Sequence, residues 1–149
     1  MELEKEIKQS KFKSEHHKML LNIIYTGSWL NNSSIKRFKP YGISPQQYNI
    51  LRILRGQHPK PASVNLLIER MLDKNSNASR LVEKLRQKKY LERVICDADR
   101  RSVNILITKK GLDLLIELEK GEKEMKKKFS HISEKEASEL NRILDKLRK

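Results

Sequence analysis

The segment from Asn75 to Lys89 restricts the possible folds of this chain more than any other segment. Its apolar residues recur at positions i, i+3, i+4 and i+7 of a helix: Ala78, Leu81, Val82 and Leu85. A helix through this segment therefore has one narrow apolar stripe that must be covered by a core. Its other face collects short hydrogen-bonding side chains followed by cations: Asn77, Ser79, Arg80, Lys84 and Arg86.

This polar face has two interpretations when the segment is taken alone. Hydrogen-bonding side chains near the start of a helix, followed by cations, can read base edges and hold phosphates. A solvated amphipathic helix has the same pattern. We expect Ser76 or Asn75 to cap the first turn, which would point free N–H groups and the positive end of the helix dipole outward.

The charge of the chain favours a polyanionic partner. Its 33 Lys and Arg against 19 Asp and Glu give a formal charge of +14 over 149 residues. Nucleic acid is the first candidate, and ordinary solubility is the alternative. A membrane surface would require a basic amphipathic helix with bulky apolar anchors, and none stands out. With 37% hydrophobic residues, the chain is expected to be helical with wet faces or to depend on a partner subunit.

Several functional classes find no support in the sequence. We expect a soluble cytoplasmic protein, because no secretory signal or run of roughly 20 apolar residues is present. The single cysteine, Cys96, fits a reducing compartment. Hydrolase, phosphate-loop and zinc-protease motifs are missing, so no enzyme is predicted. The four histidines have no partner at ligand spacing, and we expect neither metal nor cofactor.

The two ends of the chain predict helices that pair with another subunit. The first, about residues 10–38, has an apolar stripe but is too long and too polar on its outer face to be the core helix of one small domain. Thr108 is expected to cap a helix that continues to about Phe129. Ser133 and Glu136 form a capping box that opens a last helix. The last helix carries a seam suited to helix pairing: Ala137, Leu140, Leu144 and Leu147.

The middle of the chain has the order of a winged helix. Ser44 and Gln47 form a capping box for a largely apolar, central helix. Ser63 caps a short helix, and a turn of about four residues leads into the segment that begins at Asn75, which together make a helix-turn-helix. Two β-prone runs follow around a polar tip that ends in two arginines. We predict a mainly α fold with a small β-hairpin wing.

Three segments resemble MarR-type transcription regulators. The sequence from Asp99 to Gly111 is similar to that family's wing, and the matching residues are Asp99, Arg101, Ser102, Thr108 and Gly111. The segment from Ser76 to Leu85 resembles the family's recognition helix, and the one from Ser44 to Leu54 resembles its preceding helix. The family usually has a glycine after the recognition helix. This chain has Lys88, Lys89 and Tyr90 there, so the end of the helix must be formed differently.

The resemblance implies a homodimer that binds pseudo-palindromic double-stranded DNA, usually as a repressor released by a small ligand or an oxidant. It implies one domain over residues 1–149, with a winged helix-turn-helix lobe at 44–108 and dimerisation helices at 1–38 and 112–149. A two-fold dimer would place two recognition helices in successive major grooves. An architectural DNA binder and a protein-interaction module without effector control are the alternatives.

The expected DNA contacts divide by position. Asn77, Ser79 and Arg80, near the start of the recognition helix, are the candidates for base edges. Phosphate contacts are expected at this recognition helix, and also at the start of the short helix that Ser63 caps and in the loop before it. The candidates are Ser76, Lys84, Arg86, Ser63 and Lys60. In the wing, Arg101 is the candidate for the minor groove, Arg100 a less specific contact, and Asp99 a brace for Arg101.

Two further hypotheses concern regulation. Tyr25, Trp29 and Tyr48 are candidates to line a pocket for a small aromatic effector, although packing between helices explains them at least as well. Cys96 invites a redox role. Asp97 and Asp99 beside it would raise the pKa of a thiol and oppose that role, whereas nearby arginines would favour it.

Overall fold

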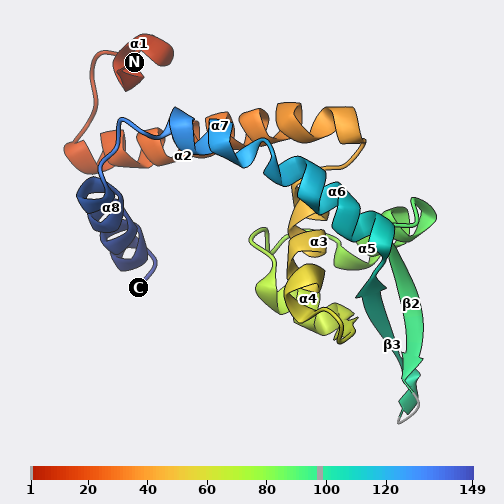
Figure 1. The fold of residues 1–149 in the computed structure, drawn as a ribbon. Coiled ribbons are helices and arrows are strands. Elements are labelled where there is room, and N and C mark those ends of the chain that lie inside the picture. Colours follow the sequence, from red (N-terminus) through yellow and green to blue (C-terminus); the bar gives the residue numbers. More distant parts are fainter. Residues whose placement is uncertain (1, 97–98) are drawn as a thin grey trace.

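The computed structural model describes residues 2–96 and 99–149, of which residues 96, 99–102, 122, 123 and 125 are described by backbone alone. The protein is mainly helical, with one small antiparallel sheet. A long helix lies along one side of the molecule, a lobe of shorter helices lies beside its end, and the β-hairpin projects from that lobe (Figure 1). The predicted fold class is confirmed.

The long helix α2 (Glu15–Phe38) begins later than the predicted position near residue 10. Ser14 caps it by accepting a hydrogen bond from the His17 N–H. Before it, the short helix α1 (Leu3–Glu6) lies against α2, where the Tyr25 hydroxyl donates to Glu6 at 2.5 Å. Leu3 is buried in this contact. The sequence pattern did not predict α1.

The central helix of the lobe is α3 (Pro45–Gln57), which follows the short 3-10 helix η1 (Lys39–Tyr41). The predicted capping box is present, because Ser44 accepts from the Gln47 N–H and the Gln47 side chain accepts from the Ser44 N–H. Ile50, Leu51 and Leu54 are almost completely buried. Their spacing of one, three and four residues turns one whole side of α3 into the core.

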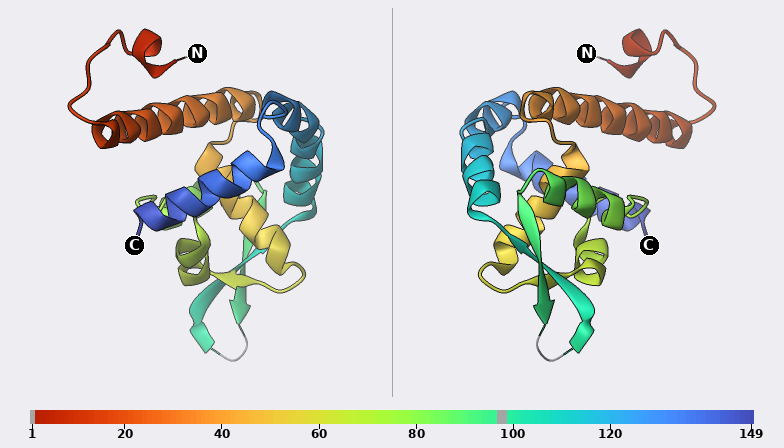
Figure 2. Two further views of the ribbon diagram at one scale, coloured as in Figure 1. Left: turned by 90° about the vertical axis from the view of Figure 1, so that its left-hand side faces the viewer. Right: turned by 90° about the vertical axis from the view of Figure 1, so that its right-hand side faces the viewer.

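The winged helix-turn-helix follows in chain order. It consists of β1 (Ala62–Ser63), α4 (Val64–Arg70), α5 (Ala78–Gln87), β2 (Leu91–Cys96) and β3 (Asp99–Ile107). The strand order is β1-β3-β2, and both pairings are antiparallel. Only the base of the hairpin enters the core, where Leu91, Ile105 and Ile107 are buried. The rest of the hairpin extends away from the helices as the wing (Figure 2).

The predicted helix from Lys109 to Phe129 is wrong in one respect, since it is broken in two. The structure has α6 (Lys109–Glu119) and α7 (Glu122–Lys128), separated by Lys120 and Gly121. At the break, the Arg37 guanidinium donates to the Leu118 carbonyl oxygen at 2.7 Å. A continuous helix would use this carbonyl for its own ladder, so Arg37 stabilises the interruption. The last helix, α8 (Glu134–Leu147), starts at the predicted Ser133–Glu136 capping box.

The buried core lies almost entirely in the lobe. Among the described residues it contains sixteen apolar side chains, from Phe38 to Leu118, most of them contributed by α3, α4, α5, α6 and the sheet. The flanking helices differ sharply. In α2 the only buried residue is Phe38, and in α8 no residue is buried. Figure 1 shows α8 standing well apart from the lobe.

Among the residues that the structure describes, no helix combines the length and the apolar content required to cross a membrane.

Candidate nucleic-acid interface

Helix α5 is held in the lobe by the apolar stripe that the sequence predicts. Ala78, Val82 and Leu85 are buried, and Leu81 is half-buried against the same core. The helix contacts α3, α4 and β2. One face of α5 is therefore fixed in the protein and the opposite face is left to solvent.

The cap of α5 differs from the expectation. Asn77, rather than Ser76 or Asn75, is the N-cap, and its Oδ1 accepts from the Arg80 N–H at 3.0 Å. The preceding residues are used by a turn at Asp73. The Asn75 N–H donates to the Asp73 carboxylate at 3.0 Å, and the Ser76 N–H donates to the Asp73 carbonyl oxygen at 3.3 Å. This turn delays the start of the helix, and it leaves Asn77 with its side-chain oxygen already engaged.

The exposed face of α5 presents Ser79, Arg80 and Lys84 to solvent. Pairing of Arg80 with Glu83 along the helix is the natural alternative to DNA contact. Within the described part of the chain, however, no carboxylate pairs with Arg80 or with Lys84. Both cations are thus available to a partner that approaches this face.

Glu83 is held by two other arginines. Arg86 donates to it through Nε at 3.0 Å and Nη2 at 2.8 Å, and Arg93 of β2 donates through Nη2 at 3.0 Å. The hydrogen bond from Arg86 is the main reason why the pKa of Glu83 lies below its ordinary value. Arg86 was predicted to touch phosphate, and its guanidinium is already engaged in this cluster. The sequence analysis did not predict this cluster, in which Glu83 pairs with Arg86 and Arg93.

The end of α5 explains how the chain manages without the usual glycine. Lys89 itself adopts the left-handed conformation, with φ 63°. The Lys89 N–H donates to the Arg86 carbonyl at 2.9 Å, and the Tyr90 N–H donates to the Leu85 carbonyl at 3.1 Å. These two bonds form a Schellman motif, in which glycine normally occupies the left-handed position.

A close junction follows, where the end of α5 meets the start of α6. The Tyr90 carbonyl accepts from the Thr108 N–H at 3.1 Å, and the Thr108 hydroxyl donates to the Lys89 carbonyl at 2.7 Å. A Cβ atom on Gly111 would lie 2.2 Å from the Tyr90 carbonyl oxygen. Only glycine fits there, because any side chain would collide with backbone.

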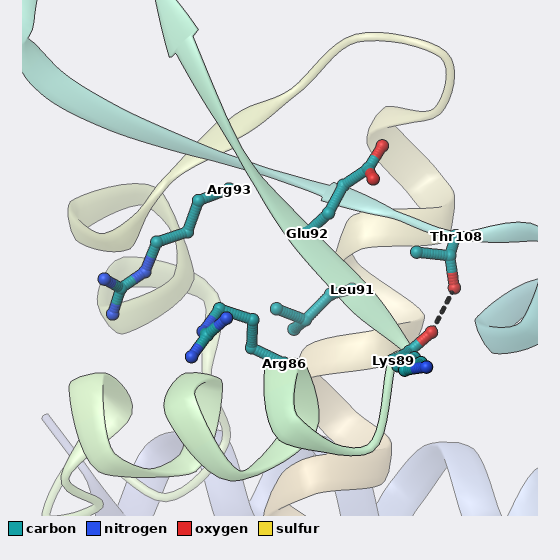
Figure 3. A pocket seen from close by; sticks show the side chains of 6 residues that line it. All are labelled: Arg86, Lys89, Leu91, Glu92, Arg93 and Thr108. Carbon is teal, nitrogen blue, oxygen red and sulfur yellow. Dashed lines mark hydrogen bonds between the residues drawn. The ribbon is translucent and has the colours of Figure 1, made fainter.

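A cleft of about 480 Å³ lies between the end of α5 and β2. It is lined by Arg86, Lys89, Leu91, Glu92, Arg93 and Thr108. In Figure 3 the side chains of Arg86 and Arg93 extend on the same side of this cleft, whereas Lys89 and Thr108 close its other end. Three of the residues that line the cleft between α5 and β2 are cationic, and one, Glu92, is acidic.

The remaining predicted contacts lie at the edge of this surface or outside the described side chains. Ser63 caps α4 by accepting from the Leu66 N–H at 3.1 Å, and Lys60 is exposed in the loop before it. The side chains of Asp99, Arg100 and Arg101 lie outside the described residues, as does that of Cys96. The wing contacts and the redox hypothesis stay predictions.

The predicted ligand-pocket residues separate into two places. Tyr25 and Trp29 line a cleft of about 490 Å³ between α1, α2 and the segment after α7. The Lys128 Nζ lies over the Trp29 ring, 4.1 Å from its centroid, and donates to Ser33 at 2.8 Å. Tyr48 does not line this cleft. Its ring stacks on Phe38 at a centroid distance of 4.4 Å, in the packing between α2 and α3.

No group of three or more potential metal-binding side chains gathers among the residues with described positions.

Comparison with known proteins gives consistent matches. Residues 41–102 match the model of the MarR family. The chain is 29% identical over 116 residues to the transcriptional regulator PecS of Dickeya dadantii, an alignment that covers 76% of this chain and 70% of PecS. A solved MepR-like protein complexed with pseudoligands is 27% identical, with a TM-score of 0.66 and coverage of 87% of this chain and 91% of that one.

The fold also matches a protein solved on DNA. The structure of S. aureus MepR in complex with DNA has a TM-score of 0.75, covering 92% of this chain and 97% of that chain, at 21% identity. At this identity the likeness shows a shared fold. The matched region of the family model spans the whole helix-turn-helix and most of the wing described above.

Proposed function

From the premise that the chain carries the winged helix of the MarR family of transcription regulators, we propose that it is a homodimeric, sequence-specific repressor that acts in the cytoplasm. It binds a pseudo-palindromic site in double-stranded DNA and leaves that site when a small ligand binds. The observation that carries the proposal is the exposed face of α5, where Arg80 and Lys84 are free of described carboxylates. The formal charge of +14 supports a polyanionic partner.

The roles of individual residues follow from their positions. Ser79 and Arg80 lie in the first turn of α5, from which a side chain enters a major groove most deeply, and Arg is the usual partner of guanine O6 and N7. Lys84, one turn later, faces phosphate. Asn77 keeps its amide N–H groups for DNA, because the cap uses its oxygen. Arg101 enters the minor groove from the wing.

A second copy of the chain is the proposed occupant of the uncovered flanking faces. Large apolar side chains that are 39–57% exposed lie along α2 and α8: Leu20, Ile24, Leu30, Ile35, Leu140, Ile143 and Leu147. Several large apolar side chains left exposed on one helix are typical of an interface with another protein chain. A dimer formed there carries two α5 helices, and such helices meet successive major grooves about 34 Å apart.

The proposed ligand is a small aromatic compound that binds in the cleft lined by Tyr25 and Trp29. Its volume of about 490 Å³ is in the range of small-molecule sites, and Phe129 and Ile132 add apolar lining. Trp29 is the only tryptophan of the chain. Its fluorescence therefore reports on this cleft directly, and a compound that releases DNA should also change the emission.

Selection of DNA from a random library tests the central proposal. The full chain is expected to recover a short inverted repeat with half-site centres one helical turn apart. Protection of the same repeat in footprinting, at an affinity that falls steeply as salt is raised, would support direct binding. Recovery of sequences without any shared motif would instead fit an architectural DNA binder, and would overturn the sequence-specific repressor.

A further inference from the structure

The cluster of Glu83, Arg86 and Arg93 joins the recognition helix to the wing. Glu83 and Arg86 belong to α5, whereas Arg93 belongs to β2, which continues into the hairpin. The carboxylate of Glu83 accepts at 2.8–3.0 Å from three N–H groups of the two arginines. Among described residues, the Glu83–Arg93 bond is the only side-chain hydrogen bond between α5 and β2.

Glu83 is in an electrostatically unfavourable place for a residue whose task is only to bind DNA. It lies one helical turn after Ser79 and Arg80, so its carboxylate is close to the surface that the phosphates approach. A carboxylate there repels DNA, and glutamine would remove the repulsion. Affinity alone therefore does not explain a glutamate at this position.

The geometry of the cluster offers a different role. A guanidinium that donates two parallel N–H bonds to a carboxylate fixes the orientation of both groups. Arg86 holds the Glu83 carboxylate in this way, and the carboxylate then holds Arg93 and with it β2. The pair is 34–52% exposed and contributes little to stability, so its loss is expected to leave the fold intact.

We propose that Glu83 is a positioning residue, which fixes β2 and the wing relative to α5 so that both fit one DNA site at once. The inference rests on the proposed function. Glu83 contributes sequence discrimination and reduces general affinity for DNA. Because recognition requires groups placed within a fraction of an ångström, a wing that shifts against α5 loses specific contacts and keeps the non-specific phosphate contacts.

The test measures Glu83→Gln against two DNA duplexes. One is the duplex that the unaltered chain selects from a random library, and the other is a scrambled duplex of the same length and composition. We expect Glu83→Gln to bind the selected duplex about tenfold more weakly, the cost of roughly one mismatched base pair, while the scrambled duplex binds as well or better. Stronger binding to both duplexes would mean that Glu83 acts only by its charge and would overturn the proposal.

Two further variants separate geometry from charge. Glu92→Gln removes the same charge from an exposed neighbour on β2 that has no ion pair with any described side chain, and it should leave the discrimination unchanged. The double variant Glu83→Gln/Arg93→Gln has the net charge of the unaltered chain, and it should discriminate as poorly as Glu83→Gln. Normal discrimination by this double variant contradicts the proposal.

Different results would overturn the repressor function and the positioning role of Glu83. If the unaltered chain does not distinguish the two duplexes, the proposed repressor function is overturned and the positioning role with it. If the unaltered chain distinguishes them and Glu83→Gln does so equally well, only the positioning role is wrong. Thermal unfolding of each variant, within a few degrees of the unaltered chain, establishes that the fold is kept.

Discussion

The lobe and the flanking helices differ in how much of their apolar side-chain surface is buried. Both have apolar residues at helical spacing. In the lobe those residues close on one another, so that Leu51, Leu67 and Leu85 are fully buried. In α8 the corresponding residues stay open to solvent, and Leu140 is 51% exposed. The lobe is complete as a single chain, whereas the flanking helices end in surfaces that one chain does not cover.

This difference assigns different tasks to the two regions. A lobe with its own core can hold α5 and the wing rigidly, as sequence recognition demands. Helices with uncovered apolar faces can set how many lobes act together. We expect substitutions in the lobe to change stability or discrimination, and substitutions in the flanking helices to change assembly.

The largest effect is expected from substitutions in the exposed apolar face of α8. Leu140→Glu combined with Leu147→Glu should convert the proposed dimer to a monomer, because both side chains are about half exposed in one chain and would face the second copy. A monomer loses the gain from two linked sites, so affinity for the full inverted repeat should fall by a factor of about 10²–10⁴. Sedimentation equilibrium and gel-shift titration at fixed salt measure the two changes.

An isolated half-site is the control for this variant. The monomer should bind the half-site as well as the unaltered lobe does, because α5 is untouched. A double variant that stays dimeric, or that loses half-site binding as well, would contradict the division of tasks.

The next effect concerns the closed core. Leu85→Ala removes a fully buried side chain from the core-facing side of α5 and should lower the free energy of unfolding by about 2–5 kcal/mol. Leu140→Ala is the matched change in a flanking helix. Measured in denaturant at low protein concentration, where the chain is a monomer, it should cost less than about 1 kcal/mol. Equal costs at the two positions would remove the contrast between the regions.

A smaller effect separates specific from general binding. Arg80→Ala should weaken binding to the selected duplex by about 1–3 kcal/mol and relax preference at the base pair it contacts. Arg142→Ala removes the same charge from α8, where Arg142 pairs with Glu139. It should change affinity slightly and equally for all duplexes in the same titration. A general loss of affinity with Arg80→Ala would assign Arg80 to phosphate.

The smallest effect is expected from replacing two lysines whose backbone is in the left-handed conformation. Lys89 has φ 63° at the end of α5, and Lys8 has φ 53° before α2. Lys89→Gly should stabilise the lobe by up to about 1 kcal/mol, because relief of backbone strain exceeds the entropy that glycine adds to the unfolded chain. Lys8→Gly lies outside the lobe and should not change its unfolding. Destabilisation by Lys89→Gly would mean that the Lys89 side chain matters more than its backbone.

Local chemistry explains which features were predictable from the sequence. The capping boxes at Ser44 and Ser133 depend on residues three positions apart, and both are present. The predicted N-cap of α5 was wrong by one or two residues. Asp73 accepts hydrogen bonds from the N–H groups of Asn75 and Ser76, so these residues form a turn before the helix. A preceding turn decided where the helix could begin.

Contacts across the chain explain the rest. The break after α6 depends on Arg37, which is 81 residues away from the carbonyl it binds. The Glu83–Arg93 bond exists only because Lys89 turns the chain back, and helical periodicity does not extend through that turn. Base-edge candidates were selected from their place on one helix, and the arginine that holds the wing was not visible in that pattern.

The junction at Gly111 has a mechanical consequence. The backbone of α6 at Gly111 lies directly against the Tyr90 carbonyl, and Thr108 donates hydrogen bonds to the carbonyls of Tyr90 and Lys89. These contacts join α5 and α6 rigidly. We therefore expect a displacement of α7 to be absorbed at residues 119–122. The bend there is supported by the Arg37 side chain and by two backbone bonds, from the Lys120 N–H to Glu117 and from the Gly121 N–H to Leu118. If the proposed ligand moves α7, we expect either that this joint flexes or that α5 turns together with α6.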